Sequence, residues 1–258
     1  MSQSESQTTQ SQTQSQPQHS VIVGGTAGIG LATARRLAAE GHRVSVIGRD
    51  PDRLKRALDE IAATDTHANA QGHVASMTDR AALDAVFADL GAIDHLVVTA
   101  PGTGAPGTLA ELDLTVLDEA FRTKFTGLAN AVQAALPHLA KQGSITLVSA
   151  ASAQAALPGT AGLAAVNGAV ETLVPTLALE LAPIRVNCVS PGVVDTEWWD
   201  RVVPAEQRSA VLESFTASVP VGRVGTPDDV ADVISLLVRN GYMSGTVIPV
   251  DGGARLKP

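Results

Sequence analysis

The feature that most constrains the fold is an alternation, from residue 20 onward, of short apolar runs with longer Ala/Leu-rich stretches. The short runs are continuously apolar rather than alternating with polar residues, which is typical of parallel strands buried on both faces. The spacing predicts strands at 20–25, 43–48, 94–100, 144–150, 184–191 and 246–251. It predicts helices at 29–41, 50–63, 79–91 and around 115–140, the last broken near Pro137, with another opening at residue 162. The expected fold class is α/β, with a doubly wound parallel sheet.

The composition sets limits on class and partners. Aromatic residues make up only 3% of the 258-residue chain, so we expect a core of Ala, Val, Leu and Ile. A net charge of −8 disfavours nucleic acid and anionic membrane surfaces as partners. No apolar run approaches the roughly 18–20 residues that span a bilayer. Cys188 is the only cysteine, so no internal disulfide forms, and a cytoplasmic location fits. No metal site is predicted.

The chain divides into a tail and a domain. Residues 1–19 are nearly all Ser, Gln and Thr, which predicts a disordered tail or, as the alternative, a partner-binding segment. The tail has neither an apolar stretch nor an arginine, so it does not resemble a targeting peptide. No boundary or repeat interrupts residues 20–258, which we interpret as one domain.

The stretch GGTAGIG, residues 24–30, lies between the first predicted strand and the first predicted helix. Glycines there allow a tight turn and a close approach to a pyrophosphate, and the helix that follows offers free N–H groups to the anion. A tight structural turn is the alternative interpretation. We predict a dinucleotide site that includes Gly24, Thr26, Ala27, Gly28, Ile29 and Gly30.

The end of the second predicted strand, VIGRD, indicates which dinucleotide binds. An acidic residue about 20 residues after the glycines usually binds the ribose 2′-hydroxyl of NAD. Gly48 stands at that point and Arg49 follows it, so a 2′-phosphate meets a guanidinium instead of a carboxylate. Asp50 is interpreted as a helix N-cap. We therefore predict NADP(H), with NAD(H) less favoured; a solvated loop charge is the alternative for Arg49.

Further motifs make the chain resemble the short-chain dehydrogenase/reductase family along the whole domain. After the glycine loop, they are LPHLAKQGSITLVSA (136–150), LALELAPIRVNCVSPGVVDT (177–196), VGRVGTPDDVADVISLLV (221–238) and SGTVIPVDGG (244–253). The resemblance implies a single Rossmann-type domain with about seven parallel strands. It also implies a homodimer or homotetramer, which Ala-rich helices at 162–182 suit, and a small-molecule substrate.

The resemblance also places residues along the cofactor. It implies that Pro191, Gly192, Val194 and Thr196 lie along the nicotinamide, with Thr196 bonded to its carboxamide. The stretch 197–215 corresponds to the variable substrate lid, where Trp198 and Trp199 either wall a pocket or only pack the lid. In VTAPG (98–102), the expected cofactor contacts are Ala100 and Gly102, and Thr99 and Pro101 depart from the family pattern. Ser76 replaces an acidic residue near the adenine, which leaves backbone groups near Met77 to bind it.

The main departures concern the chemistry. The family uses a Tyr and, four residues later, a Lys, which share one helix face at that spacing. Leu163 and Asn167 stand at these positions, Ala150 stands at the serine position, and the only tyrosine, Tyr242, lies in NGYMSG near the C-terminus. The family's Asn on the preceding helix is replaced by Lys124, in FRTKFTG.

Lys and Asn are thus exchanged between two neighbouring helices. We expect Lys124 to supply an ammonium from the opposite side of the site, with its pKa lowered by burial. Asn167 is expected to bind a ribose hydroxyl, and Ser149 and Ser152 to contact a substrate oxygen. The alternatives are a surface lysine, a polar helix-face Asn and two structural serines.

The cofactor carries the hydride chemistry, and general acid catalysis contributes about 10²–10⁴-fold, so loss of the tyrosine does not exclude hydride transfer. The leading hypothesis is an NADP(H)-dependent oxidoreductase with a rearranged site, acting on a small carbonyl, alcohol, C=N or C=C substrate. One alternative is a non-catalytic NADP(H)-binding sensor or partner protein. A second alternative is a non-redox isomerase or cyclase.

Overall fold

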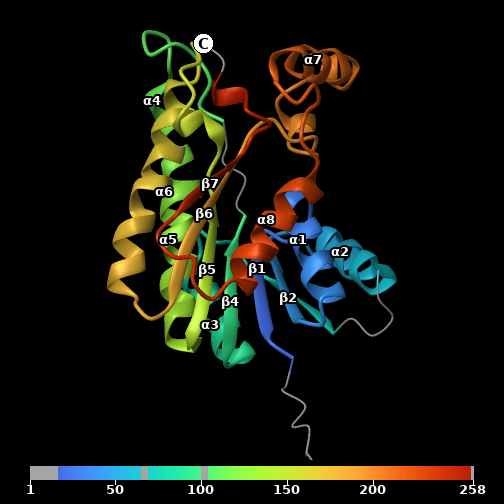
Figure 1. Ribbon diagram of the computed structural model, residues 1–258, viewed down its shortest axis with the longest axis vertical. Helices are drawn as coiled ribbons and strands as arrows, with labels where there is room; N and C mark the ends of the chain where they lie inside the picture. Colours follow the sequence, from blue (N-terminus) through green and yellow to red (C-terminus); the bar gives the residue numbers. More distant parts are fainter. Residues whose placement is uncertain (1–16, 65–68, 100–103, 257–258) are drawn as a thin grey trace, which may run out of the picture.

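The computed structural model describes residues 17–64, 69–99 and 104–256, and within these ranges the chain forms a single parallel sheet covered by helices on both faces (Figure 1). The strands run in the order β3-β2-β1-β4-β5-β6-β7, which confirms the predicted doubly wound, seven-stranded sheet. The strands are β1 (His19–Val23), β2 (Arg43–Gly48), β3 (Ala70–Val74), β4 (Ile93–Val98), β5 (Leu139–Val148), β6 (Arg185–Pro191) and β7 (Val247–Val250). The order reverses at β1, so the crevice between β1 and β4 is the topological switch point.

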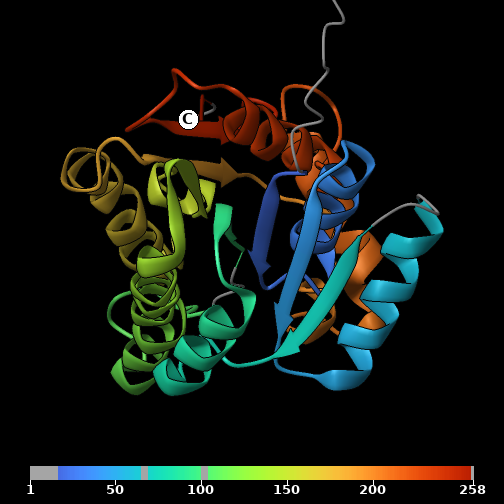
Figure 2. The same ribbon diagram turned by 90° about the horizontal axis from the view of Figure 1, so that it is seen from below.

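The helices are α1 (Gly28–Ala39), α2 (Pro51–Thr64), α3 (Arg80–Leu90), α4 (Leu114–Ala120), α5 (Gly127–Ala135), α6 (Ala161–Glu180), α7 (Ala205–Ser218) and α8 (Pro227–Arg239). Short helices are η1 (Phe121–Thr126), η2 (Leu136–His138), η3 (Ala151–Ala153), η4 (Trp199–Arg201) and η5 (Ala254–Leu256). Seen from below, α3, α5 and α6 lie on one side of the sheet and α1 and α2 on the other (Figure 2). This arrangement is what buried strands with apolar residues on both faces require.

Two apolar clusters fill the layers, and neighbouring residues of one strand belong to opposite clusters. Val21 and Val23 of β1 pack with α3, α5 and α6, whereas Ile22 packs with α1, α2 and α8. Successive side chains of a strand point to opposite faces, so every position of a two-sided strand must be apolar. Among the described residues of these two clusters, Phe87 is the one fully buried aromatic side chain, which confirms a core built mainly from aliphatic residues.

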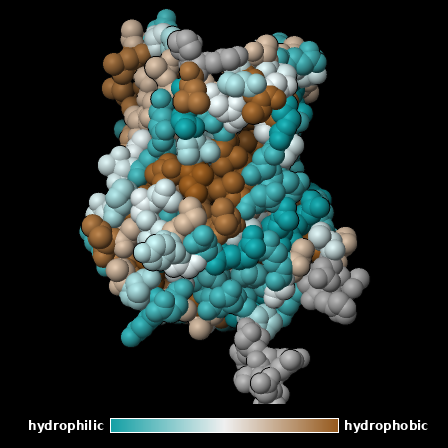
Figure 3. All heavy atoms as spheres, in the orientation of Figure 1, coloured by the Kyte–Doolittle hydropathy of each residue, from teal (hydrophilic) through white to brown (hydrophobic). Residues whose placement is uncertain are grey.

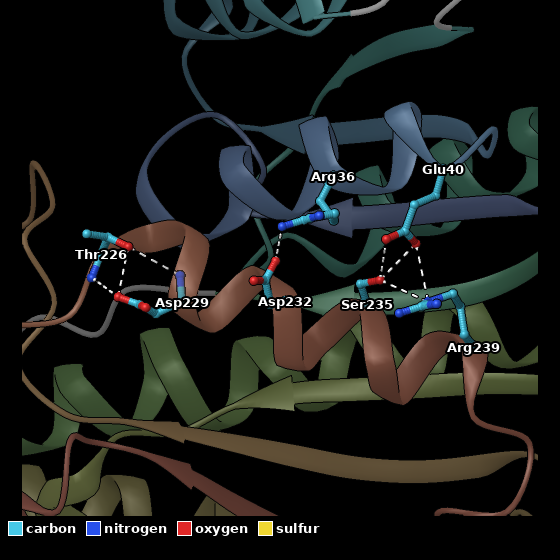
Figure 4. Close-up of polar contacts among 7 residues, drawn as sticks. All are labelled: Arg36, Glu40, Thr226, Asp229, Asp232, Ser235 and Arg239. Carbon is cyan, nitrogen blue, oxygen red and sulfur yellow. Dashed lines mark hydrogen bonds and ion pairs between the residues drawn. The ribbon is translucent and has the colours of Figure 1, made fainter.

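Polar contacts join α1 to α8 on the outer surface (Figure 4). Arg36 pairs with Asp232, and the Ser235 hydroxyl donates to both carboxylate oxygens of Glu40, at 2.7 and 2.8 Å. At the start of α8, Thr226 and Asp229 form a capping box, in which each side chain accepts from the other's backbone N–H. These contacts fix α8 against the helix that begins at the glycine loop.

Three predicted boundaries need correction. β3 was not predicted, because its sequence AQGHV is only half-buried and carries a single β-branched residue. The prediction of a single helix at 115–140 is wrong, because this segment forms four successive elements: α4, the π-helical turn η1, α5 and η2. The break at Pro137 is confirmed, but β5 begins at Leu139, five residues before the predicted strand.

Helix α6 also corrects an expectation about membranes. By length and composition alone, Ala161–Glu180 is long and apolar enough to cross a bilayer, with a mean hydropathy of 1.3. The prediction that no segment approaches membrane-spanning length is therefore wrong. The helix carries only two charged residues, Glu171 and Glu180, and is otherwise rich in Ala, Leu and Val. Here it packs against β6 and η3, with one face buried.

Candidate functional site

A cleft of about 1260 Å³ opens at the carboxyl ends of the strands. Its walls come from segments after β1, β2, β3, β5 and β6, from α4 and η1, and from the N-terminal half of α6. Helix α7 lies above this end of the sheet, at the top of Figure 1. The cleft exceeds the 300–1,000 Å³ of common ligand pockets, so it has room for a cofactor and a substrate together.

The glycine loop forms one wall of this cleft. Gly24 and Gly28 adopt φ values of +84° and +51°, which favour glycine. A Cβ on Gly30 would collide with the carbonyl oxygen of Gly24, so only glycine allows α1 to begin this close to the loop. All six residues predicted here line the cleft, and no side chain caps the N-terminus of α1. The first N–H groups of α1 therefore suit a phosphate.

Thr99, at the end of β4, supports the loop from below. Its hydroxyl lies 3.1 Å from the carbonyl oxygens of both Val23 and Gly24, to which it donates. The departure from the family pattern at this position thus fixes the shape of the glycine loop. The predicted contacts Ala100 and Gly102, and the neighbouring Pro101, lie outside the described residues.

Two arginines line the cleft near the end of β2, where a 2′-phosphate is predicted. Arg49 is exposed there, and Arg53 lies in the first turn of α2. A Cβ on Gly48 would lie 2.3 Å from the Thr26 methyl group, so any larger residue at Gly48 requires the Thr26 side chain to move. Asp50 accepts the backbone N–H groups of Asp52 and Arg53 at 2.9 and 3.0 Å, which confirms it as the cap of α2.

The remaining predicted cofactor positions also line the cleft. They are Met77 after β3, and Pro191, Gly192, Val194 and Thr196 after β6. Thr196 lies close to Gly28, since a Cβ on that glycine would sit 3.2 Å from the threonine methyl group. The loop after β6 therefore comes close to the glycine loop, and both segments line the same cleft.

Lys124 is buried at the floor of the cleft, with only 6% of its surface exposed, and it is not a surface lysine. Its Nζ donates to Asn167 Oδ1 at 2.5 Å and to the Ser149 carbonyl oxygen at 3.3 Å. It lies in the π-helical turn η1, and such turns occur often at functional sites. Neither partner carries a negative charge, so burial lowers the pKa of Lys124 to about 8, partly opposed by Cys188 and the Glu171 carboxylate.

Asn167 connects the lysine to the rest of α6. Its Nδ2 donates to the Leu163 carbonyl oxygen at 2.9 Å and to Ser152 Oγ at 3.0 Å, while its Oδ1 accepts from Lys124. The predicted exchange therefore brings Lys124 and Asn167 into direct contact. Ser152 joins the same network through its hydroxyl oxygen and lines the cleft.

Ser149 is oriented differently from Ser152. Its hydroxyl donates to Glu171 Oε1 at 2.7 Å, and the Ser190 hydroxyl donates to the same oxygen at 2.7 Å. Gln154 donates to the other carboxylate oxygen at 2.8 Å. The Ser149 hydroxyl is thus held by Glu171, and its carbonyl contacts Lys124.

Glu171 was missed in the sequence. A signal was available, because it follows Asn167 by four residues and so shares a helix face with Leu163 and Asn167. A charged residue there, in a helix otherwise rich in Ala, Leu and Val, indicates a polar partner. The Glu171 carboxylate accepts hydrogen bonds from Ser149, directly after β5, and from Ser190 of β6.

The other sequence candidates are placed clearly. Leu163 and Ala150 line the cleft, whereas Tyr242 is fully exposed beyond α8 and does not line it. Both tryptophans of the lid line the cleft, with ring centroids 4.9 Å apart. An ammonium at the floor and an apolar lid suit proton donation to an organic molecule, and the uncapped N-terminus of α1 suits an anion.

Comparison with known proteins agrees with the fold. Residues 24–255 match the family model described as Enoyl-(Acyl carrier protein) reductase. A short-chain dehydrogenase/reductase of Stachybotrys chlorohalonatus is 31% identical, covering 92% of this chain and 96% of its own.

Solved structures are similar over the same length. A small-chain dehydrogenase in complex with NADPH is 34% identical with a TM-score of 0.81, covering 93% of this chain and all of its own. A reductase/Diels-Alderase from Malbranchea aurantiaca is 27% identical with a TM-score of 0.84, covering 94% of this chain and 97% of its own. With its sheet order, glycine loop and relatives in agreement, the chain belongs to the short-chain dehydrogenase/reductase family.

Proposed function

We propose that this protein is an NADP(H)-dependent oxidoreductase in which Lys124 takes the place of the family's tyrosine. The observation that carries the proposal is the buried Lys124 ammonium, held by Asn167 at the floor of the cofactor cleft. The substrate is a carbonyl or alcohol, or a related C=N or C=C compound. When bound, the nicotinamide supplies or accepts the hydride.

The protein's own groups perform the proton step. In reduction, Lys124 Nζ donates a proton to the substrate oxygen as negative charge develops there, and the amine then regains a proton from water. Asn167 and the Ser149 carbonyl hold the ammonium in place. Glu171 adds negative charge behind it, which favours the protonated form. Ser152, which lines the cleft, is proposed to bind the substrate oxygen, and Ser149 to position Lys124.

NADP(H) is supported by the fit of the residues and by the relatives that carry it. Gly48 stands where NAD-binding proteins carry an acidic residue, Arg49 and Arg53 line the cleft nearby, the N-terminus of α1 is uncapped by side chains, and the small-chain dehydrogenase above was solved with NADPH. Asn167 is assigned mainly to holding Lys124, since three hydrogen bonds already engage its amide; any contact with the ribose is secondary.

Arg49→Ala tests the cofactor assignment. We expect the Kd for NADPH to rise roughly 10- to 100-fold, because a charge-assisted hydrogen bond contributes about 1.5–3 kcal/mol, while the Kd for NADH stays nearly the same. Fluorescence titration of both cofactors measures this. Arg56→Ala, an exposed arginine of the same loop–helix segment that does not line the cleft, is the control. Equal weakening of NADPH and NADH would contradict the assignment.

A second prediction concerns pH. Reduction needs the ammonium form of Lys124, whose pKa is lowered to about 8 by burial. We expect kcat/KM for carbonyl reduction to be constant below pH 8 and to fall about tenfold per unit above it. Alcohol oxidation needs the neutral amine, so its kcat/KM should rise through the same range. A reduction profile that stays flat to pH 10 would exclude Lys124 as the proton donor.

The proposal is tested directly by NADPH oxidation, followed at 340 nm, over ketones, aldehydes, imines and enones. Tight NADPH binding without turnover of any of them would favour a non-catalytic sensor or partner protein.

A second catalytic function is favoured by one observation, the likeness to a protein named reductase/Diels-Alderase. Conversion of a substrate without change in nicotinamide absorbance would indicate such a cyclase or isomerase.

We also propose a homodimer or homotetramer. The outer face of α6 exposes Ala161, Ala165 and Thr172, small side chains that allow close helix packing. On another face, apolar side chains gather in the middle of the view in Figure 3, over the area where β6 and β7 lie in Figure 1. Edge strand β7 is only half-buried along its length, and Leu236 of α8 is 42% exposed. Sedimentation or scattering measurements in solution test this proposal.

A further inference from the structure

The part of the cleft beyond the glycine loop is walled by apolar side chains on two sides. The wall from α6 and the loop before it consists of Leu157, Pro158, Leu163 and Val166. The wall from the lid consists of Trp198, Trp199, Val202, Phe215 and Val219. Leu163 joins this apolar wall to the polar network, because its carbonyl oxygen accepts a hydrogen bond from the Asn167 amide. Asn167 in turn accepts from Lys124. A substrate whose oxygen reaches Lys124 must therefore place its body between two apolar walls.

The lid wall is unusually aromatic for this chain. Both tryptophans and one of the four phenylalanines line it, in a protein with only 3% aromatic residues. Trp198 and Trp199 meet edge to face, and the rings of Trp199 and Phe215 lie 5.6 Å apart. The indole N–H of Trp199 donates to the Val194 carbonyl oxygen at 2.9 Å, which fixes its ring. Such a wall presents a large, rigid apolar surface.

The charged side chains near these walls are already neutralised. Glu119 and Arg122 form a two-pronged ion pair at 2.7 Å, and Arg255 pairs with Asp251 at 3.2 Å. Glu197 lies 3.7 Å from Arg53.

Among the described residues lining this part of the cleft, Lys124 is therefore the one cation without a carboxylate partner, and it is buried. Lys124 is engaged by the reactive oxygen in the proposed function, so a carboxylate or phosphate elsewhere on the substrate would lose its hydration with no second unpaired cation among these residues to replace it.

From these observations we infer that the substrate is a neutral, bulky, multi-ring carbonyl compound rather than a small keto acid. The inference rests on the proposed function, since it places the reactive oxygen at Lys124. Affinity comes from apolar surface buried between Leu157 and Leu163 on one side and the tryptophans on the other, and it increases with the number of rings. The apolar walls offer no hydrogen bond to the substrate carbonyl oxygen, and Lys124 donates one to it.

Tryptophan fluorescence tests the inference without any turnover, because both tryptophans lie in the lid wall. The protein is saturated with NADP⁺ and titrated with 4-androstene-3,17-dione, trans-1-decalone, cyclohexanone and pyruvate. We expect saturable changes with the two multi-ring ketones, with Kd at least about tenfold lower for decalone than for cyclohexanone, since the second ring buries several more CH₂ groups. Pyruvate should give no saturable change. Equal or tighter binding of pyruvate would overturn the inference.

Leu157→Asp places a charge in the α6-side wall, at a side chain that is 56% exposed and so tolerates the change. We expect the Kd for decalone to rise at least about tenfold while the Kd for NADP⁺ is unchanged. Leu109→Asp, at a leucine that is 75% exposed and does not line the cleft, is the matched control. Decalone binding that is unaltered by Leu157→Asp would contradict the assigned wall.

The same titrations separate this inference from the proposed function. Saturable binding of multi-ring ketones, with no NADPH oxidation, would remove the oxidoreductase proposal and leave the substrate class standing. Reduction of cyclohexanone or pyruvate by NADPH, with no binding of multi-ring ketones, would overturn the substrate class and leave the oxidoreductase standing.

Discussion

Replacing Lys124 with Ala is expected to lower kcat for carbonyl reduction by about 10²–10⁴-fold, the usual contribution of a general acid. This corresponds to roughly 3–5 kcal/mol of the activation barrier. The effect is large because Lys124 is the buried cation at the floor of the cleft, and its partners Asn167 and the Ser149 carbonyl cannot donate a proton in its place. Steady-state kinetics with the best ketone of the panel, at saturating NADPH, measures the loss.

The controls separate chemistry from folding. Lys124→Met keeps most of the buried volume, so it should fold with a Tm near that of the parent and still lose activity. Lys141→Ala, at an exposed lysine of β5, should retain full activity. The Kd for NADPH should change by less than about threefold in both Lys124 variants. Activity within twofold of the parent in Lys124→Met would show that the proton comes from another group, and the exchange of Lys and Asn would then be structural.

The sequence predicts the fold well because the buried strands are recognisable without their neighbours. The apolar runs 21–23 of β1 and 96–98 of β4 identify two-sided strands, and the glycine loop identifies the start of α1. Strand β3 escapes this reasoning because it lies at the sheet edge, where the half-buried AQGHV carries no apolar run and pairs with β2 mainly through backbone groups.

The site is only partly predictable, for a different physical reason. The positions of Lys124 and Asn167 can be read from the sequence, but their contact depends on η1, whose π-helical hydrogen bonds shift the register by one residue. Glu171 depends on hydroxyls from β5 and β6, 22 and 19 residues away in the chain. The helix spacing indicates that Glu171 has a polar partner, but no local pattern shows which hydroxyls it contacts, so these partners become visible only in the folded chain.

Gly30→Ala is expected to raise the Kd for NADPH roughly 100-fold, and it tests the part of the proposal that the sequence predicts best. A Cβ at this position would collide with the backbone oxygen of Gly24, which cannot rotate away, and with Thr99 Oγ1, which could move only by giving up its hydrogen bonds to the loop. Relieving the clash costs about 1–3 kcal/mol and moves the N-terminus of α1 away from the glycine loop. The predicted phosphate site consists of that helix end and loop together, so the loss appears in cofactor affinity before it appears in the chemical step.

Fluorescence titration with NADPH measures the loss of affinity, and circular dichroism confirms that the variant is folded. Gly241→Ala, where an added Cβ meets nothing within 4 Å, is the matched control and should bind NADPH as the parent does. Should Gly30→Ala fail to fold, Thr99→Val removes only the hydroxyl that holds the loop carbonyls, and a roughly tenfold weaker NADPH affinity is expected. Parent-like NADPH affinity in Thr99→Val and in a folded Gly30→Ala would mean that the dinucleotide does not bind at this loop.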